Sequence, residues 1–261
     1  MTQPLVRLHV HEHTGTIILN RPEKRNALSR QLIDELSQAF FDMRMQKSVR
    51  AVVLTGAGPA FCAGMDLAEM LDTSKRDDAH RQWRDDAVQY QSLLETMLRF
   101  PKPIIAAVNG PAVAGGAGLV LGCDVVLAAE GATFGLPEPR RGIVAGMVSP
   151  LLVFRLGGGQ AARLLLTSEI ISSAEAHRIG LFHEIAHADQ LWPRAMLVAA
   201  QCAKGAPEAL LLTRKLLNET IGEHLATLLS AGAAASATAR TTEAAAEGLS
   251  AFLEKREPKW P

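Results

Sequence analysis

The 261-residue sequence predicts an α/β fold, because apolar runs typical of buried strands alternate along it with amphipathic helical stretches. With 48% apolar residues, the chain can bury a large core in a single domain that carries an appendage. The composition changes late in the sequence, where glycines and strand formers become rare and Leu and Ala dominate. We therefore predict a core at residues 1–195 and a helical region at residues 196–261.

The first expected elements are two strands and a helix. Apolar and polar residues alternate over residues 6–10, which predicts a half-buried strand, and TIILN predicts a second strand after Gly15. Leucines and a phenylalanine recur at helical spacing over residues 28–40, which predicts an amphipathic helix.

The later elements of the core follow from three continuous apolar runs. RAVVLTG, KPIIAAVNG and VVLAA predict fully buried strands, which are typical of parallel sheets. A long charged helical stretch is expected from about Asp66 to Leu98, between the first two of these runs. Ser172 and Glu175 have capping-box spacing before a helix that we expect Gly180 to end.

The charge balance and the cysteines exclude several classes of function. Lys plus Arg and Asp plus Glu number 27 each, so the basic excess that is usual for nucleic-acid binding is missing. Three widely spaced cysteines support neither a disulfide framework nor a zinc site. The N-terminal residues lack the apolar region of a signal peptide, and the most apolar stretch is broken by Asn, Pro and Gly. We expect a cytoplasmic protein that binds no membrane and no metal.

Two glycine segments share a design that favours chemistry by the backbone. FCAGMDLAEM and VAGGAGLVLG each place small residues at the entry to a helix, where unpaired N–H groups and the positive helix end meet. Two such ends that converge on one oxygen would form an oxyanion hole. The alternative is that both glycine turns serve tight packing only.

Nucleotide binding by these glycines is less well supported. A P-loop needs GK[ST] after its glycines, and this chain has none. A dinucleotide fingerprint would open directly from the strand, whereas here NGPA intervenes, although Glu138 does lie 20 residues beyond Gly118.

Four segments in order resemble the motifs of the crotonase superfamily, the enoyl-CoA hydratase/isomerase family: LNRPEKRNALS, GAGPAFCAGMDLAEM, KPIIAAVNGPAVAGGAGLVLGCDVVLA and FGLPEPRRGIVAG. The resemblance covers nearly the whole chain. It implies a spiral of ββα units whose C-terminal helices build a trimer, often stacked into a hexamer. It also implies an acyl-CoA thioester substrate and no cofactor beyond the coenzyme A of the substrate.

The same resemblance implies roles for individual residues. The oxyanion hole falls on the backbone N–H groups of Met65 and Gly115, which would hold the thioester oxygen. Contacts to coenzyme A are implied for Arg25, Ala27, Ala63, Asp66 and Leu67. Phe252 and Lys255 match positions that cover the adenine nucleotide, often from a neighbouring subunit; an ordinary amphipathic final helix is the alternative for these two.

One departure from the family pattern bears on the reaction. Hydratases of the family hold water between two glutamates; the second is present as Glu138, after Pro137, but the first falls on Gly118. We expect Gly118 and Pro137 beside the substrate, and Glu138 as the single acid/base. Losing a positioned acid or base typically costs 10²–10⁴-fold, whereas one base suffices to move a double bond. The sequence therefore favours isomerisation; one-glutamate hydration and silent acyl-CoA binding are the alternatives.

Two further expectations concern residues near this glutamate. Arg140 and Arg141 follow Glu138 closely, and a cation within about 4–6 Å would favour the carboxylate form; two solvated arginines are the alternative. The only tyrosine, Tyr90, lies in the charged helical stretch, where we expect it to be a packing residue.

Overall fold

The structure, a computed structural model, describes residues 3–220 and 225–260 and contains two β-sheets. The larger sheet has the order β1-β2-β3-β4-β6-β9, in which β1 is antiparallel to β2 and the other neighbours are parallel. Its strands are β1 (Val6–His11), β2 (Thr14–Leu19), β3 (Ala51–Gly56), β4 (Ile104–Val108), β6 (Val125–Ala129) and β9 (Glu184–Ala186). The smaller sheet has the order β5-β7-β8, with β5 (Ala112–Val113), β7 (Thr133–Gly135) and β8 (Ile170–Ser172).

The chain repeats one unit, in which a strand of the large sheet is followed by an extended segment of the second layer and then by a helix. The clearest units are β4-β5-α4 and β6-β7-α5, with α4 at Gly115–Leu121 and α5 at Val148–Thr167. In the unit before them, β3 leads to a bridge between Cys62 and Ala112, then to α2 (Leu67–Ser74) and α3 (Ala79–Leu98). This repetition confirms the predicted spiral of ββα units.

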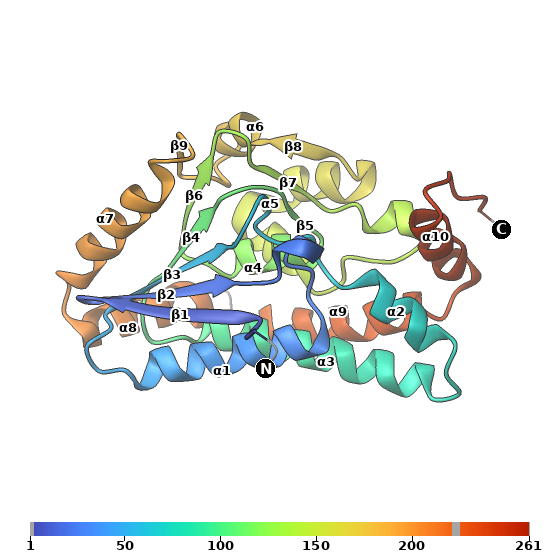
Figure 1. The fold of residues 1–261 in the computed structure, drawn as a ribbon, viewed down its shortest axis with the longest axis horizontal. Helices are drawn as coiled ribbons and strands as arrows, with labels where there is room; N and C mark the ends of the chain where they lie inside the picture. Colours follow the sequence, from blue (N-terminus) through green and yellow to red (C-terminus); the bar gives the residue numbers. More distant parts are fainter. Residues whose placement is uncertain (1–2, 221–224, 261) are drawn as a thin grey trace.

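Helices cover both faces of the large sheet (Figure 1). On one side α1 (Arg30–Met45), α3 and α9 (Leu225–Ala239) lie side by side. On the other side α7 (Leu191–Ala203) packs against β3, β4 and β6. Ala195 and Ala199 of α7 are both fully buried against the alanine- and valine-rich face of these strands. The boundary expected between residues 195 and 196 therefore falls inside α7, a helix that packs directly on the large sheet.

The remaining helices connect the layers and close one end of the molecule. The N-cap of α6 (Ser173–Arg178) is Ser172, whose side chain accepts a hydrogen bond from Glu175 N, as the capping-box spacing predicts. α8 (Pro207–Lys215) continues into a π-helical segment at Leu216–Thr220. α10 (Glu243–Leu253) packs against α2 and against the short 3-10 helix η2 (Glu138–Arg141). Another 3-10 helix, η1, spans Pro22–Lys24. The trimer expected of the C-terminal helices stays a prediction.

Two helix predictions differ from the structure. The first helix begins at Arg30 with Ser29 as its N-cap, and Leu28 lies before it in an extended bridge to Met65. Leu28 is fully buried like the helix residues, so its apolar character alone does not distinguish the two positions. The charged stretch from Asp66 to Leu98 forms two helices, α2 and α3, because a turn at residues 75–78 interrupts the helix.

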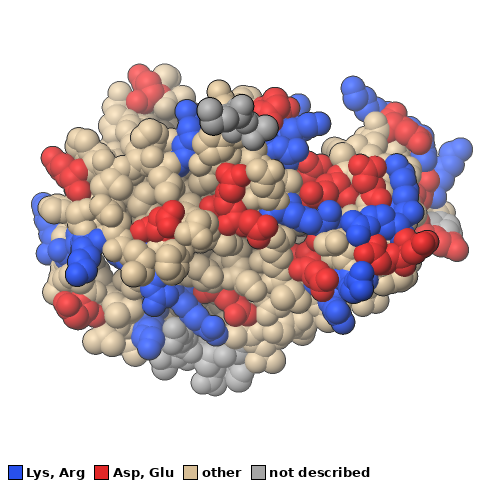
Figure 2. Space-filling model, turned by 60° about the horizontal axis from the view of Figure 1, so that its bottom comes forward, with Lys and Arg blue, Asp and Glu red and all other residues tan. Residues whose placement is uncertain are grey.

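The surface carries both signs of charge. Figure 2 shows Lys and Arg interspersed with Asp and Glu over the face that it presents, in line with the balanced composition. Within residues 3–220 and 225–260, no helix alone has the length and apolar character to span a bilayer; α7 and the following helix pass that test only jointly, across a 102° bend.

Candidate active site

A pocket opens where consecutive units of the spiral meet. Each unit contributes the residues between its second-layer segment and its helix, so equivalent positions of neighbouring units lie side by side. Helices α3 and α9 close the far side of the pocket. Its lining comprises Ala63, Met65, Leu67, Met70, Tyr90, Ala114, Gly115, Glu138, Arg141, Ile143, Val144, Ala145, Gly146, Met147, Val148, Ser236 and Arg240.

Two backbone N–H groups face this pocket from neighbouring units. The bridge between Leu28 and Met65 uses Gly64 O and Asp66 N, so the Met65 N–H is left out of it. Gly115 N is the first of α4 and has no acceptor within the helix. A Cβ atom built on Gly115 would lie 3.6 Å from Met65 N, so both groups border the same small volume. This arrangement suits an oxygen that accepts two hydrogen bonds.

Close backbone approach holds the two segments together. A Cβ atom on Gly116 would overlap the Cys62 carbonyl oxygen, and one on Gly64, where φ is +88°, would press on Ala114 and Gly115 N. Ala114 itself has φ +53° and ψ −124°, a conformation that residues with a side chain rarely adopt. Because Gly64 and Gly116 have no side chains, the two segments can lie this close together. Larger residues at these positions would push the segments apart.

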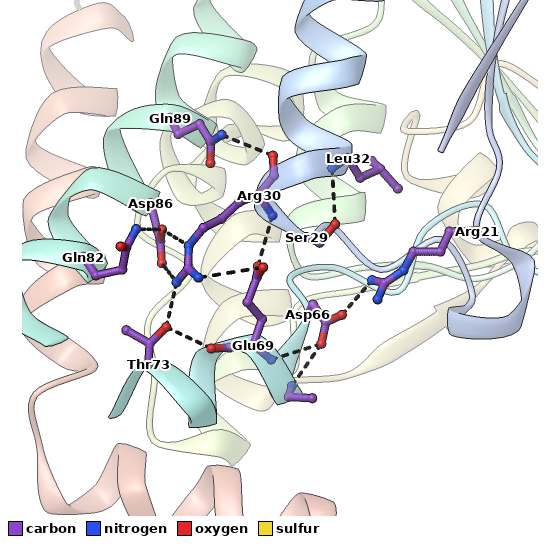
Figure 3. A network of polar contacts seen from close by, with 11 residues as sticks. Arg21, Ser29, Arg30, Leu32, Asp66, Glu69, Thr73, Gln82, Asp86 and Gln89 are labelled. Atoms are coloured by element: carbon purple, nitrogen blue, oxygen red, sulfur yellow. Dashed lines mark hydrogen bonds and ion pairs between the residues drawn. The ribbon is translucent and has the colours of Figure 1, made fainter. Parts of the chain in front are cut away.

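A polar network fixes the α2 end of the pocket (Figure 3). Asp66 caps α2 by accepting from Ala68 N and Glu69 N, and its other oxygen lies 2.6 Å from Arg21 Nη1. Arg30, at the start of α1, donates to Asp86 of α3 and to Thr73 of α2. The network ties three helices to one another and so positions the Met65 N–H and the face of α3 that lines the pocket.

Glu138 is the only carboxylate among the residues that line the pocket in the described structure. Its side chain is buried, and Oε2 has no hydrogen-bond partner. Burial raises the pKa of Glu138 to about 7, and the opposing effect of Arg141 is smaller. Arg140 instead donates to Thr167 O at an exposed site. A carboxyl group with this pKa can both take and return a proton near neutrality.

Tyr90 occupies the space where a side chain at position 118 would lie. A Cβ atom on Gly118 would overlap the Tyr90 hydroxyl, which itself donates to Gly115 O. Tyr90 is buried and lines the pocket with Glu138, whereas Gly118 does not line it. Burial raises the pKa of the phenol well above 10, so it stays protonated at neutral pH. Tyr90 is part of the hydrophobic core, as expected of a packing residue, and in addition lines the pocket; no local pattern in the sequence signals this second feature.

The residues expected to contact coenzyme A lie along the rim of the same pocket or near it. Ala63 and Leu67 line it, and Ala63 N donates to Arg25 O, which places the exposed η1 segment beside the α2 entry. Ala27 O accepts from Arg21, the residue that also holds Asp66. Their contacts with coenzyme A stay predictions.

The remaining predicted site residues surround Glu138. Pro137 directly precedes it and lies outside the pocket lining. Phe252 of α10 is half exposed and stacks on Arg141, with the guanidinium carbon 4.5 Å from the ring centroid. Lys255 is exposed beyond the end of α10. Their roles toward the adenine nucleotide stay predictions as well.

Neither metal ligation nor a reactive thiol is indicated by the described residues. Among them, no three His, Cys, Asp or Glu side chains gather in a way that could hold a metal ion. Cys62, next to the oxyanion segment, donates to Asn26 O, and burial raises its pKa to about 12. It is a packing residue, as its small apolar character suggests.

Comparisons with known proteins agree with this fold. The family model described as enoyl-CoA hydratase/isomerase matches residues 11–261. A putative enoyl-CoA hydratase of Thermus thermophilus is 42% identical over 95% of this chain and 97% of its own length. The mevalonyl-coenzyme A hydratase of Aspergillus fumigatus is 35% identical over 95% and 91%, respectively. A solved structure of a putative enoyl-CoA hydratase from Mycobacterium avium paratuberculosis superposes with a TM-score of 0.87 at 31% identity, covering 97% of this chain and 98% of that one.

Proposed function

The chain belongs to the enoyl-CoA hydratase/isomerase family, and on that premise we propose that it adds water to a 2-enoyl-CoA thioester with Glu138 as the single acid/base. The thioester oxygen would lie between the N–H groups of Met65 and Gly115. These donors stabilise the enolate that forms when a nucleophile attacks C3. One such donor is typically worth about 3 kcal/mol in the transition state.

The proton transfers follow from the position of Glu138. Its carboxylate removes a proton from water while the water oxygen bonds to C3, and the electron pair of the double bond moves into the enolate. The protonated Glu138 then delivers this proton to C2, and the thioester carbonyl re-forms. The net change is addition of one water molecule across C2 and C3. No electron leaves the substrate, so the reaction calls for no redox cofactor.

The observation that carries this proposal is the Tyr90 hydroxyl in the space beside Gly118. The proton of this hydroxyl is donated to Gly115 O, so its oxygen can accept a hydrogen bond from a water molecule in the pocket. Tyr90 thus supplies a second polar partner for water where the family pattern has a glutamate. Because the pKa of Tyr90 is raised, its phenol stays neutral near pH 7. Tyr90 can therefore bind a water molecule but does not act as the base that takes a proton from it.

Movement of a double bond from the 3,4 to the 2,3 position is the second candidate. It is favoured by the single carboxylate among the lining residues, because one base can take the proton from C2 and return it at C4. Both reactions pass through an enolate that the same two N–H groups hold.

Product analysis separates the two reactions. The purified protein is given crotonyl-CoA and 3-hexenoyl-CoA, and the products are identified by chromatography. Hydration of crotonyl-CoA to 3-hydroxybutyryl-CoA supports the first proposal. Conversion of 3-hexenoyl-CoA to 2-hexenoyl-CoA without any hydration overturns it in favour of isomerisation. No change in either thioester, together with tight binding of both, would indicate a silent acyl-CoA-binding member.

Replacing Tyr90 by phenylalanine should lower hydration more than isomerisation. The variant keeps the ring and loses the oxygen that holds water, so we expect kcat for crotonyl-CoA to fall about 10-fold or more. Any activity on 3-hexenoyl-CoA should change by less than that. Equal losses on both substrates would mean that Tyr90 acts only through the Gly115 segment, and an unchanged hydration rate would remove Tyr90 from the mechanism.

The dependence of activity on pH should report Glu138. The ionised form starts the reaction, so kcat/KM should rise with pH through an apparent pKa of about 7 and then level off. A group with its ordinary value near 4.5 would already be ionised throughout this range. Rates measured from pH 5.5 to 8.5 check this, and a flat profile over that range would contradict it.

A further inference from the structure

One cation that lines the pocket, Arg240, has two nitrogen atoms without a hydrogen-bond partner among the described residues. Arg240 follows the last residue of α9 and is only 6% exposed, yet its Nε and Nη1 atoms are buried without a hydrogen-bond partner. It lines the same pocket as Glu138 and Tyr90. A buried guanidinium that lacks acceptors is costly, because its lost hydration is not replaced. Such a group indicates that an acceptor is supplied from elsewhere.

The nearby carboxylate of Asp86 is already engaged. Arg30 donates to both of its oxygens, at 2.6 and 2.8 Å, and Gln82 donates to one of them at 2.8 Å (Figure 3). Asp86 attracts Arg240, while Arg30 repels it. Two guanidinium groups therefore lie near one carboxylate, and the positive charge of Arg240 is not neutralised by a contact.

The location of Arg240 relative to the reacting carbons is given by α3. Tyr90 borders the reaction site, and Asp86, whose negative charge acts on Arg240, lies four residues earlier on the same face of α3. Four residues of α-helix rise about 6 Å, a span that a few carbon–carbon bonds cover. Ser236, one turn before Arg240 on α9, is also buried and lines the pocket.

We propose that the pocket selects the coenzyme A monothioester of a short unsaturated dicarboxylic acid, whose free carboxylate binds Arg240 and Ser236. This inference rests on the proposed function, since it places the thioester at Met65 and Gly115 and C2 at Glu138. An acyl chain of about five or six carbons spans the distance. A guanidinium binds a carboxylate through two parallel hydrogen bonds, and the serine hydroxyl can donate a third. A monocarboxylic thioester of equal length would leave the buried cation unpaired, so the site discriminates against it.

Binding of saturated thioesters tests this inference independently of turnover. Glutaryl-CoA is compared with pentanoyl-CoA, and adipoyl-CoA with hexanoyl-CoA, by titration calorimetry. We expect at least one dicarboxylic thioester to bind about 100-fold more tightly than the monocarboxylic thioester with which it is compared. Arg240→Met should abolish this preference. Arg194→Met, which removes an exposed arginine of α7 paired with Glu184, should retain it. Equal or weaker binding of both dicarboxylic thioesters, or a preference that survives Arg240→Met, overturns the proposal.

The stability of the variants distinguishes binding from a structural role. Arg240→Met removes an unpaired buried charge, so its melting temperature should equal or exceed that of the parent. A marked decrease would mean that Arg240 stabilises the fold through Asp86. Arg240→Lys keeps the charge and loses the paired geometry, so it should reduce the preference about 10-fold and serves if the methionine variant fails to fold.

Turnover separates failure of this inference from failure of the proposed reaction. Glutaconyl-CoA and crotonyl-CoA carry the same double bond and differ at C4, where glutaconyl-CoA has the extra carboxylate. If the binding preference holds and neither thioester is hydrated, the proposed reaction fails and the carboxylate site stands. If crotonyl-CoA is hydrated as well as glutaconyl-CoA and the calorimetric preference is missing, the reaction stands and the carboxylate site fails.

Discussion

Glutamine in place of Glu138 is expected to lower kcat on the true substrate by about 10²–10⁴-fold, the usual cost of losing a positioned acid/base. Glutamine matches glutamate in size but cannot exchange a proton with water or carbon. Glu138 is the only carboxylate that lines the pocket in the described structure, so no neighbouring group can substitute for it. Glu12→Gln, at an exposed position in the turn after β1, is the matched control and should keep full activity. Retention of full turnover by Glu138→Gln would refute the assignment.

The same variant has a thermodynamic signature that rules out unfolding as the cause. The pKa of Glu138 is raised to about 7 in the folded protein, so ionisation opposes folding above its ordinary value of 4.5. The folded state loses stability as pH rises from 4.5 to 7, by about 3 kcal/mol in all if this group acts alone. Glutamine does not ionise. Glu138→Gln should therefore be more stable than the parent at pH 8, with the difference disappearing near pH 4.5, as measured by urea unfolding.

Replacing Gly115 by alanine should abolish most activity while the protein stays folded. The added Cβ atom would lie 3.6 Å from Met65 N, in the volume assigned to the thioester oxygen, and its tightest contact would be 3.1 Å to a flexible Leu28 methyl group. We expect kcat/KM to fall about 10²–10³-fold, as when an oxyanion-hole donor is lost. Circular dichroism and a melting curve should match those of the parent. Normal activity of Gly115→Ala would place the oxygen elsewhere.

The adjacent glycine provides the contrast. A Cβ atom on Gly116 would overlap the backbone of Cys62, which cannot move without separating two units of the spiral. Gly116→Ala should therefore destabilise the fold by about 1–3 kcal/mol or more, measured by chemical unfolding. Gly115 therefore affects substrate binding, whereas Gly116 affects packing. Equal stability of the two alanine variants would contradict this division.

The sequence predicts the parts of the site that depend on neighbouring residues in the chain. The helix entries at Asp66 and Gly115 follow from capping and glycine patterns, and the structure places them as expected. Glu138 follows from the resemblance of its segment to the family's motif, and the structure adds its burial and the pKa that results. In these segments the local sequence determines the backbone, and the backbone supplies the chemistry.

The groups that we assign to water and to the acyl chain could not be predicted in this way. Tyr90 and Arg240 lie on or beside helices whose residues show only ordinary amphipathic spacing. Which residues of α3 meet the pocket depends on how α3 packs on α9 and on the missing side chain of Gly118. Long-range packing therefore decides what the single sequence leaves open.

The origin of the lining residues has a consequence for how such an enzyme can be altered. The N–H groups and Glu138, which we assign to the thioester, come from the junctions between strands and helices, whereas Ser236 and Arg240, which we assign to the acyl group, come from α9 and the residue after it. The groups that we assign to the thioester and those that we assign to the acyl group therefore lie in separate segments of the chain, and Tyr90, which we assign to water, lies on a third segment, α3. Exchanging α3 and α9 together between relatives while Tyr90 is kept, which preserves their mutual packing, should transfer the choice of acyl group and leave the handling of the thioester unchanged.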